Sequence, residues 1–198
     1  MGKIVYLMGK SSTGKDTIFK RLLEDDSLKL TNIVPYTTRP IRDGEKDGEE
    51  YFFTDEEEFL RLRDQGKVIE DRLYDTFHGP WRYFTVDDGQ VQLQSQNHIM
   101  IGTLEAYGKM REYFGKDKIL PVMIELDDGI RLQRALNRER RQDSPKYEEM
   151  CRRFLADSAD FSEEKIHEAG ILRRFSNDEL ECSLGEIRTY IMENLDAK

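Results

Sequence analysis

Residues 9–17 read GKSSTGKDT and follow directly on an apolar run at positions 4–8, which reads IVYLM. Gly9, four further residues, Gly14 and Lys15 satisfy the GxxxxGK pattern of a phosphate-binding loop. Such a loop curls between a strand and a helix, so that backbone N–H groups and the positive end of the helix dipole face an anion. The stretch therefore predicts a strand, a phosphate-binding loop and a helix at the start of an α/β fold.

The same loop supplies candidate ligands for a nucleoside triphosphate and its metal ion. Lys15 would reach the terminal phosphates, and the hydroxyl of Thr17 would bind phosphate or hydrated Mg²⁺. Asp16 stands where the pattern has Ser or Thr, and it is either a ligand of Mg²⁺ or a solvated carboxylate stabilised by the helix dipole. The predicted ATP-binding residues here are Gly9, Ser11, Ser12, Thr13, Gly14, Lys15, Asp16 and Thr17, with Thr17 and Asp16 as candidate metal ligands.

Composition excludes several classes of function. The 198 residues suit one α/β domain with inserted segments. A net charge of -9, from 31 basic and 40 acidic residues, disfavours general binding to nucleic acid or to an anionic membrane. No stretch approaches the roughly 18 apolar residues of a membrane span. The first residues read as a strand rather than a secretion signal, and only Cys151 and Cys182 are present, so we expect a cytoplasmic protein.

Apolar strand-like runs alternate with helical patterns along most of the chain. The expected strands are 3–8, 98–101, 119–124 and 171–175, and the expected helices are 15–23, 103–114, 127–140, 147–169 and 178–194. This alternation predicts a parallel sheet with crossover helices. Residues 33–88 are irregular and rich in aromatic side chains, which predicts a small β-rich insertion beside the main sheet.

A second informative run spans residues 36–51 and reads YTTRPIRDGEKDGEEY. One proline and two glycines force turns in it, and these turns hold Arg39 and Arg42 three residues apart. Because a guanidinium is planar and always charged, two of them form a clamp for an anion such as phosphate. Hydroxyl groups that would complete the cradle belong to Thr37, Thr38 and Tyr51. Taken alone, the run also fits two solvated surface arginines.

Together with the loop at Gly9, this run resembles guanylate kinases, whose signature for the acceptor nucleotide reads roughly TTRxxRxGExxGxxY. The matching positions are Thr37, Thr38, Arg39, Arg42, Gly44, Glu45, Gly48 and Tyr51. The order of the family continues with a helix at 56–62 and a strand at 68–70 that carries an acidic base-reading residue, Glu70. The resemblance covers nearly the whole chain. It implies a P-loop kinase with a parallel-sheet core, a small β-rich acceptor-binding insertion and a helical lid.

The division that the resemblance implies is a core at 1–32, 97–126 and 154–198, an insertion at 33–96 and a lid at 127–153. The implied reaction is in-line transfer of the γ-phosphoryl group from ATP, with Mg²⁺, to GMP. Phosphoryl transfer needs two anionic substrates held in line and their charge neutralised in a dry cleft. Closure of the lid would exclude water that otherwise intercepts the phosphoryl group.

Specific roles follow from the same resemblance. The implied catalytic residues are Lys15, Arg39, Arg134, Arg138 and Arg153, with Arg152 as the alternative to Arg153. The implied acceptor contacts are Thr38, Arg39, Arg42, Tyr51, Glu70, His78 and Thr103, while Asn177 and Asp178 match the late Asn-Asp pair beside the adenine pocket. Residues 139–142 look inserted relative to the usual lid, so Arg140 or Arg141 could replace Arg138, and charges on this helix could also be simply solvated.

The chain departs from the family where guanine is read. Pro35 and Pro80 stand in place of serines, His78 in place of a tyrosine, and Ile101 and Thr103 in place of two aspartates. Each hydrogen bond lost at a buried base edge costs about 1–3 kcal/mol, so several losses could erase selectivity for GMP. His78 either contacts the acceptor phosphate or is an ordinary packed or surface histidine.

Three functions therefore stay open at this point. They are guanylate kinase activity, kinase activity on another nucleoside monophosphate, and a catalytically weak nucleotide-binding or interaction protein of the same fold. The retained Lys15 and the arginine clamp favour an enzyme whose partners are small-molecule nucleotides. The oligomeric state is not set by the sequence.

Overall fold

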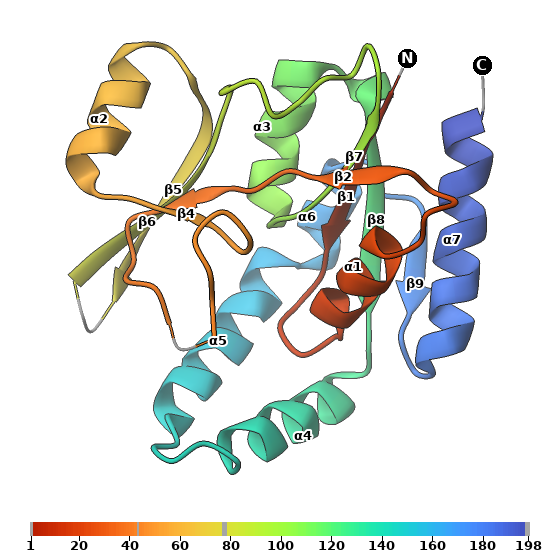
Figure 1. Cartoon of the computed structure of the whole chain (residues 1–198). Coiled ribbons are helices and arrows are strands. Elements are labelled where there is room, and N and C mark those ends of the chain that lie inside the picture. The colour runs from red at the N-terminus through yellow and green to blue at the C-terminus, as the bar shows by residue number, and fades with distance from the viewer. Residues whose placement is uncertain (1, 43, 77–78, 197–198) are drawn as a thin grey trace.

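The computed structural model describes residues 2–42, 44–76 and 79–196. In chain order the elements are β1 Ile4–Met8, α1 Lys15–Leu23, β2 Leu30–Asn32, β3 Tyr36–Thr37, β4 Phe52–Phe53, α2 Glu56–Asp64, β5 Val68–Thr76, β6 Gly79–Val86, β7 Asn97–Ile101, α3 Leu104–Phe114, the 3-10 turn η1 Lys116–Lys118, β8 Ile119–Glu125, α4 Asp128–Glu139, α5 Tyr147–Asp160, α6 Glu163–Glu168, β9 Arg174–Ser176 and α7 Leu180–Asp196 (Figure 1).

Two sheets organise these elements. The larger has the strand order β2-β7-β1-β8-β9, and all of its pairings are parallel. The smaller has the order β4-β3-β6-β5 and mixes parallel with antiparallel pairing. Figure 1 shows the smaller sheet, with α2, to one side of the larger sheet and its helices. The predicted α/β class, with a parallel sheet and a β-rich middle third, is therefore confirmed.

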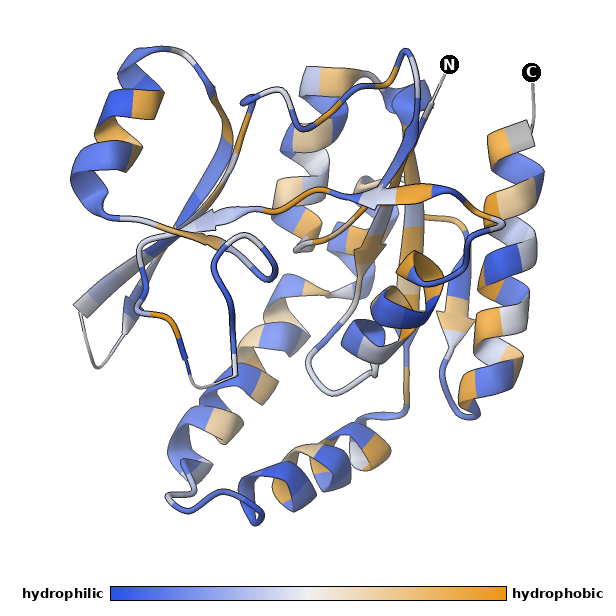
Figure 2. Ribbon diagram, viewed as in Figure 1, coloured by the Kyte–Doolittle hydropathy of each residue, from blue (hydrophilic) through white to orange (hydrophobic). Residues whose placement is uncertain are grey.

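Helices cover both faces of the larger sheet, and the central strand shows how. Ile4, Tyr6 and Met8 pack in one apolar cluster with residues of α3 and α6, whereas Val5 and Leu7 pack in a second cluster with residues of α1 and α7. All five side chains are fully buried, as expected for a parallel strand covered on both faces. The hydrophobic colouring of the central strands in Figure 2 follows this burial. The end of β1 is thus a rigid base for the loop at Gly9.

The last strand begins later than the sequence pattern predicted. Ile171 is buried, but it packs in the cluster on the α3 side, and Leu172 is 95% exposed. The two residues therefore do not continue a sheet, and β9 covers only Arg174–Ser176. The expected strand at 171–175 was wrong in its first half because burial alone does not show which element a side chain packs against.

The expected single helix at 147–169 is two helices, α5 and α6. The chain turns at Phe161, which is buried in the core cluster, and Ser162 starts the new helix by accepting a hydrogen bond from the backbone N–H of Lys165 at 3.4 Å. Strand β2 was also missed, because three residues carry too little pattern to be recognised. Among the described residues, no helix is both long and apolar enough to cross a bilayer.

Candidate active site

The loop between β1 and α1, which the sequence predicts to bind phosphate, turns at two glycines with positive φ angles. Gly14 caps α1 with a φ of +90°, and Gly9 has a φ of +154°. A Cβ at residue 9 would lie 2.3 Å from the carbonyl oxygen of Ile124 in β8, so only glycine fits there. Ser12 also has a positive φ, of 64°, and its buried hydroxyl has no partner among the described residues. The loop is therefore held in a strained form, which is common at ligand-binding sites.

Asn177, in the loop between β9 and α7, fastens this loop from one side. Its Nδ2 donates to the carbonyl oxygen of Thr13 at 2.6 Å, and both side chains are buried. Arg134 of α4 donates to the carbonyl oxygen of Asn177 at 3.4 Å. Three segments far apart in the sequence, each with a predicted nucleotide-binding residue, therefore meet beside Gly14.

Arg131 and Asp157 fasten the loop from the other side, and the sequence analysis assigned neither of them a role. Arg131 is 1% exposed; its Nε donates to the carbonyl oxygen of Ser11 at 2.9 Å and its Nη2 to Asp157 at 3.0 Å. The Asp157 carboxylate in turn accepts from the backbone N–H of Ser11 at 2.7 Å. Helices α4 and α5 are thereby tied to the phosphate-binding loop.

A weak signal for Arg131 exists in the sequence. The buried residues of α4 are Arg131, Ala135 and Glu139, spaced four apart on one face. Because two of the three are charged, a hydropathy pattern does not mark this face as buried. The sequence therefore does not separate Arg131 from the other charged residues of this helix.

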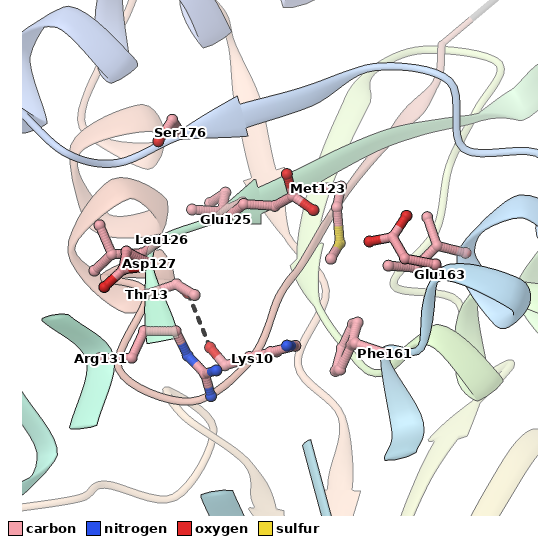
Figure 3. A pocket seen from close by; sticks show the side chains of 12 residues that line it. Lys10, Thr13, Met123, Glu125, Leu126, Asp127, Arg131, Phe161, Glu163 and Ser176 are labelled. Carbon is pink, nitrogen blue, oxygen red and sulfur yellow. Dashed lines mark hydrogen bonds between the residues drawn. The ribbon is translucent and has the colours of Figure 1, made fainter. Parts of the chain in front are cut away.

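A cavity of about 290 Å³ lies behind the loop, on the side of α6. Figure 3 shows Lys10, Thr13 and Arg131 at one end of it, and Glu125 and Glu163 further in. Both glutamates accept hydrogen bonds from Arg174, at 3.0 Å and 2.8 Å. Carboxylates repel phosphate, so we expect the phosphates of a nucleotide at the N-terminus of α1 and not beside Glu125 and Glu163.

The predicted metal ligands lie on the first turn of α1. Asp16 and Thr17 are both exposed, and neither side chain has a hydrogen-bond partner among the described residues. Mg²⁺ prefers oxygen ligands and keeps several waters when it binds with nucleotide phosphates. A carboxylate and a hydroxyl on the turn that follows Gly14 therefore fit a nucleotide-bound Mg²⁺. No cluster of three metal-binding side chains occurs in the described part of the chain.

Arg39 forms the core of the second predicted site, in the smaller sheet. It is 3% exposed and donates through both terminal nitrogens to the Glu45 carboxylate, at 2.7 Å and 2.6 Å. Its guanidinium lies 5.1 Å from the ring centre of Tyr51 and 5.3 Å from that of Phe53. Burial opposes its charge and is the largest single influence, yet the hydrogen bonds and charge of Glu45, together with Tyr83 and Tyr51, raise the pKa of Arg39. The Nε is buried without a partner among the described residues, which leaves a charged donor for an anion.

The remaining predicted acceptor contacts differ in burial and in hydrogen-bond partners. Tyr51 lies against Phe53 and Tyr83, and burial raises the pKa of Tyr51. Arg42 is exposed, and its backbone N–H donates to Glu45. The Thr38 hydroxyl accepts from the backbone N–H of Arg82 at 2.9 Å, which fixes the loop to β6. His78 falls outside the described residues.

Glu70 is buried under an arginine that the sequence analysis did not single out. Arg72 donates to the two oxygens of Glu70 at 3.0 Å and 3.3 Å, and to the Thr103 hydroxyl at 3.2 Å. Thr103 is the N-cap of α3, so the contact joins the smaller sheet to the larger one. Residue 72 stands two positions after Glu70 on the same face of β5, and this spacing was the signal available in the sequence.

The predicted lid arginines lie on α4 and α5. Arg134 and Arg138 are exposed and four residues apart on α4, and the Arg138 side chain bonds to none of the described residues. Arg152 and Arg153 both donate to Glu149, at 2.7 Å and 2.8 Å. The pair on α5 is therefore partly neutralised, whereas the pair on α4 is not.

Comparisons with known proteins agree with this geometry. The family model described as guanylate kinase matches residues 1–111, more than half of the chain. This chain belongs to the guanylate kinase family. A guanylate kinase of Oleidesulfovibrio alaskensis is 33% identical over 188 residues, which cover 94% of this chain and 85% of that protein. A guanylate kinase of Porphyromonas gingivalis is 28% identical over 196 residues, 98% of each chain.

A solved structure supports the fold of the whole chain. The crystal structure of guanylate kinase from Anaplasma phagocytophilum has a TM-score of 0.68, covers all of this chain and 88% of its own, and is 21% identical in sequence. The resemblance to guanylate kinases is thus confirmed, and with it the expected enzyme class, an ATP-dependent nucleoside monophosphate kinase.

Proposed function

We propose that this protein transfers the γ-phosphoryl group of ATP, bound with Mg²⁺, to GMP. Membership of the guanylate kinase family supports the reaction class, and relatives that match nearly the whole chain carry that name. In support of two anionic substrates, the chain has one anion site at the N-terminus of α1 and a second at Arg39. The observation that carries the proposal is the buried, unpartnered Nε of Arg39, which leaves a charged donor in the segment with the acceptor signature.

The proposed division of the chain remains a core, an acceptor-binding insertion at 33–96 and a lid at 127–153. In this scheme Lys15 neutralises the β- and γ-phosphates of ATP, which the loop from Gly9 to Thr17 cradles. Mg²⁺, when bound, supplies further charge neutralisation at the phosphates, beside Asp16 and Thr17. Arg39, Arg42 and Tyr51 bind the acceptor phosphate. Thr38, Glu70, His78 and Thr103 are kept as proposed acceptor contacts, and Asn177 as a proposed ATP contact.

The proposed clamp on the transferring group consists of Arg134, Arg138 and Arg153. The exposure of the α4 arginines supports this role, since no carboxylate among the described residues holds either guanidinium; Arg134 would exchange its hydrogen bond to the Asn177 carbonyl for one to phosphate. Arg153 must first leave Glu149. We further propose a cytoplasmic enzyme that acts on free nucleotides, because a net charge of -9 disfavours polyanionic partners.

The departures at Pro35, Pro80 and Thr103 favour one competing proposal, a kinase for another nucleoside monophosphate. A coupled assay of nucleoside diphosphate formation distinguishes a GMP kinase from a kinase for another monophosphate. The assay contains ATP and Mg²⁺, with GMP, dGMP, AMP, CMP or UMP as the acceptor. Lys15→Ala serves as the blank for contaminating kinases, and Lys20→Ala, an exposed lysine on the same helix, is its matched control. Turnover with GMP that Lys15→Ala abolishes and Lys20→Ala retains supports the proposal. If Lys15-dependent turnover occurred only with a different monophosphate, that monophosphate would replace GMP as the proposed acceptor.

A further inference from the structure

We propose that Arg72 is a specificity-determining residue of the acceptor site, and that with Thr103 it makes the site selective for 6-oxopurine monophosphates as a class. GMP and inosine monophosphate, which lacks the 2-amino group of GMP, would then be accepted almost equally. The inference rests on the proposed function, in which Glu70 and Thr103 face the acceptor base. Its basis is the hydrogen-bond capacity that Arg72 leaves to those two residues.

The carboxylate of Glu70 has little capacity left for a base. A carboxylate oxygen has two lone-pair positions. Oε1 accepts from the Thr85 hydroxyl at 2.7 Å and from Arg72 at 3.3 Å, so both of its positions are used. Oε2 accepts from Arg72 at 3.0 Å, which leaves one position. Because guanine offers two adjacent donors, N1–H and the 2-amino group, Glu70 can accept only one of them.

Thr103 is restricted to the role of a donor. Its hydroxyl oxygen accepts from Arg72 at 3.2 Å and from the backbone N–H of Ala106 at 3.2 Å. A hydroxyl has two lone pairs and one O–H, so the O–H is what remains for a ligand. Thr103 can therefore reach only an acceptor atom of the base.

Arg72 itself adds a charged donor at the same place. It has five N–H groups, of which two go to Glu70 and one to Thr103. Its side chain is 12% exposed, while that of Glu70 is fully buried, so the arginine is the more accessible partner. Burial opposes its charge and is the largest single influence, but the Glu70 carboxylate together with Tyr6 and Tyr74 raises the pKa of Arg72.

These donors define the base that fits. A 6-oxopurine presents O6 and N7 as adjacent acceptors, which suit a guanidinium and a hydroxyl, and its N1–H suits the last position on Glu70. These three atoms are common to guanine and hypoxanthine. Adenine presents an amino group in place of O6, and two donors would then face each other. The 2-amino group of guanine has no dedicated acceptor in this arrangement.

The test compares GMP with inosine monophosphate. In the unmodified protein we expect kcat/KM values for the two within about fivefold of each other, with AMP far below both. Arg72→Ala frees one lone-pair position on each oxygen of Glu70, and the preference for GMP over inosine monophosphate should then rise at least tenfold. Arg72→Gln, which is closer in shape, should raise it less. Arg82→Ala is the matched control, because Arg82 is paired with Glu56 and Asp71 in the same sheet and should leave the ratio unchanged.

Two results would overturn the inference. One is an unmodified protein that prefers GMP over inosine monophosphate by a hundredfold or more. The other is a ratio that neither Arg72 variant changes while far-UV circular dichroism shows both to be folded. Calorimetric binding of the two monophosphates gives the same ratio without turnover. If the protein showed no turnover but the Arg72 variants still changed the ratio of its affinities for GMP and inosine monophosphate as expected, the result would count against the proposed function and not against the role of Arg72.

Discussion

The side-chain amide of Asn177 donates to the carbonyl oxygen of Thr13 at 2.6 Å, across 164 residues of sequence. This hydrogen bond joins the loop after the last strand to the phosphate-binding loop after the first. Both partners are buried, so water cannot replace either one if the other is lost. The bond therefore gives Asn177 a structural role, which is to hold the loop at Thr13, in addition to its proposed contact with ATP.

Asn177→Ala should lower the free energy of unfolding by about 1–3 kcal/mol, because the buried carbonyl of Thr13 loses its donor. The KM for ATP should rise several-fold as the loop relaxes. Urea unfolding and initial rates measure the two effects. Ser176→Ala, at an exposed neighbouring residue, is the control. A variant with normal stability and a normal KM would show that Asn177 does not hold the loop.

Gly14→Ala should be destabilised by about 2 kcal/mol or more. The φ of +90° costs about 1–2 kcal/mol for a residue with a Cβ, and that Cβ would lie 2.4 Å from Nδ2 of Asn177. In the double variant with Asn177→Ala the clash disappears. We therefore expect the combined loss to be smaller than the sum of the single losses by about 0.5 kcal/mol or more. Strictly additive losses would contradict the close approach.

Arg131→Ala should lower the free energy of unfolding by about 3 kcal/mol, because it leaves Asp157 without its buried partner and the Ser11 carbonyl without a donor. Arg131→Lys keeps the charge but not the forked geometry and should fall between. Chemical denaturation measures both, with Gln133→Ala as the exposed control on the same helix. If the loss of unfolding free energy in Arg131→Ala matched that in Gln133→Ala within about 0.5 kcal/mol, Arg131 would not hold the loop.

Glu45→Gln should cost about 2 kcal/mol at neutral pH, since it leaves the buried charge of Arg39 without its carboxylate. The hydrogen bonds from Arg39 lower the pKa of Glu45 below its usual value of 4.5. The stability that this group adds is thus present above pH 4.5 and is lost as the pH falls below it. Urea unfolding at pH 7 and pH 3 should show a gap between the two proteins that narrows in acid. A gap independent of pH would mean that the charge of Glu45 is not responsible.

Glu149→Gln should raise kcat/KM about two- to fivefold at pH 7, because it releases Arg152 and Arg153 for the phosphoryl group. Hydrogen bonds from these arginines lower the pKa of Glu149 to about 2, so the carboxylate keeps its charge at every pH where the enzyme is folded and active. Its partly exposed ion pairs contribute about 1 kcal/mol or less to stability. Glu148→Gln, the exposed neighbour, is the control. A fall in kcat/KM would indicate that Glu149 positions the arginines instead of competing for them.

Much of the fold could be predicted from local patterns. Helix α1 begins at Lys15 and ends at Leu23, as expected, because a glycine turn fixes its start and an apolar face its length. The strands at the centre of the larger sheet lie within a residue or so of their expected positions, since strands buried on both faces are continuously apolar. The errors occurred at short elements and at the turn at Phe161, where the N-cap Ser162 and the acidic first turn of α6 were a local signal that the pattern of a single helix overrode.

The candidate site divides in the same way. The sequence by itself determined the glycine turns of the loop before α1 and the turns around Arg39, because glycine spacing and the turn residues act within a few positions of the chain. Only the tertiary structure decided which partners charged residues take. Arg72 reaches Thr103, 31 positions away, and Arg131 and Asp157 hold Ser11 from 120 and 146 positions away, because folding brings distant segments of the chain together. The energy of a buried charge depends on its neighbours in space, which no local pattern specifies.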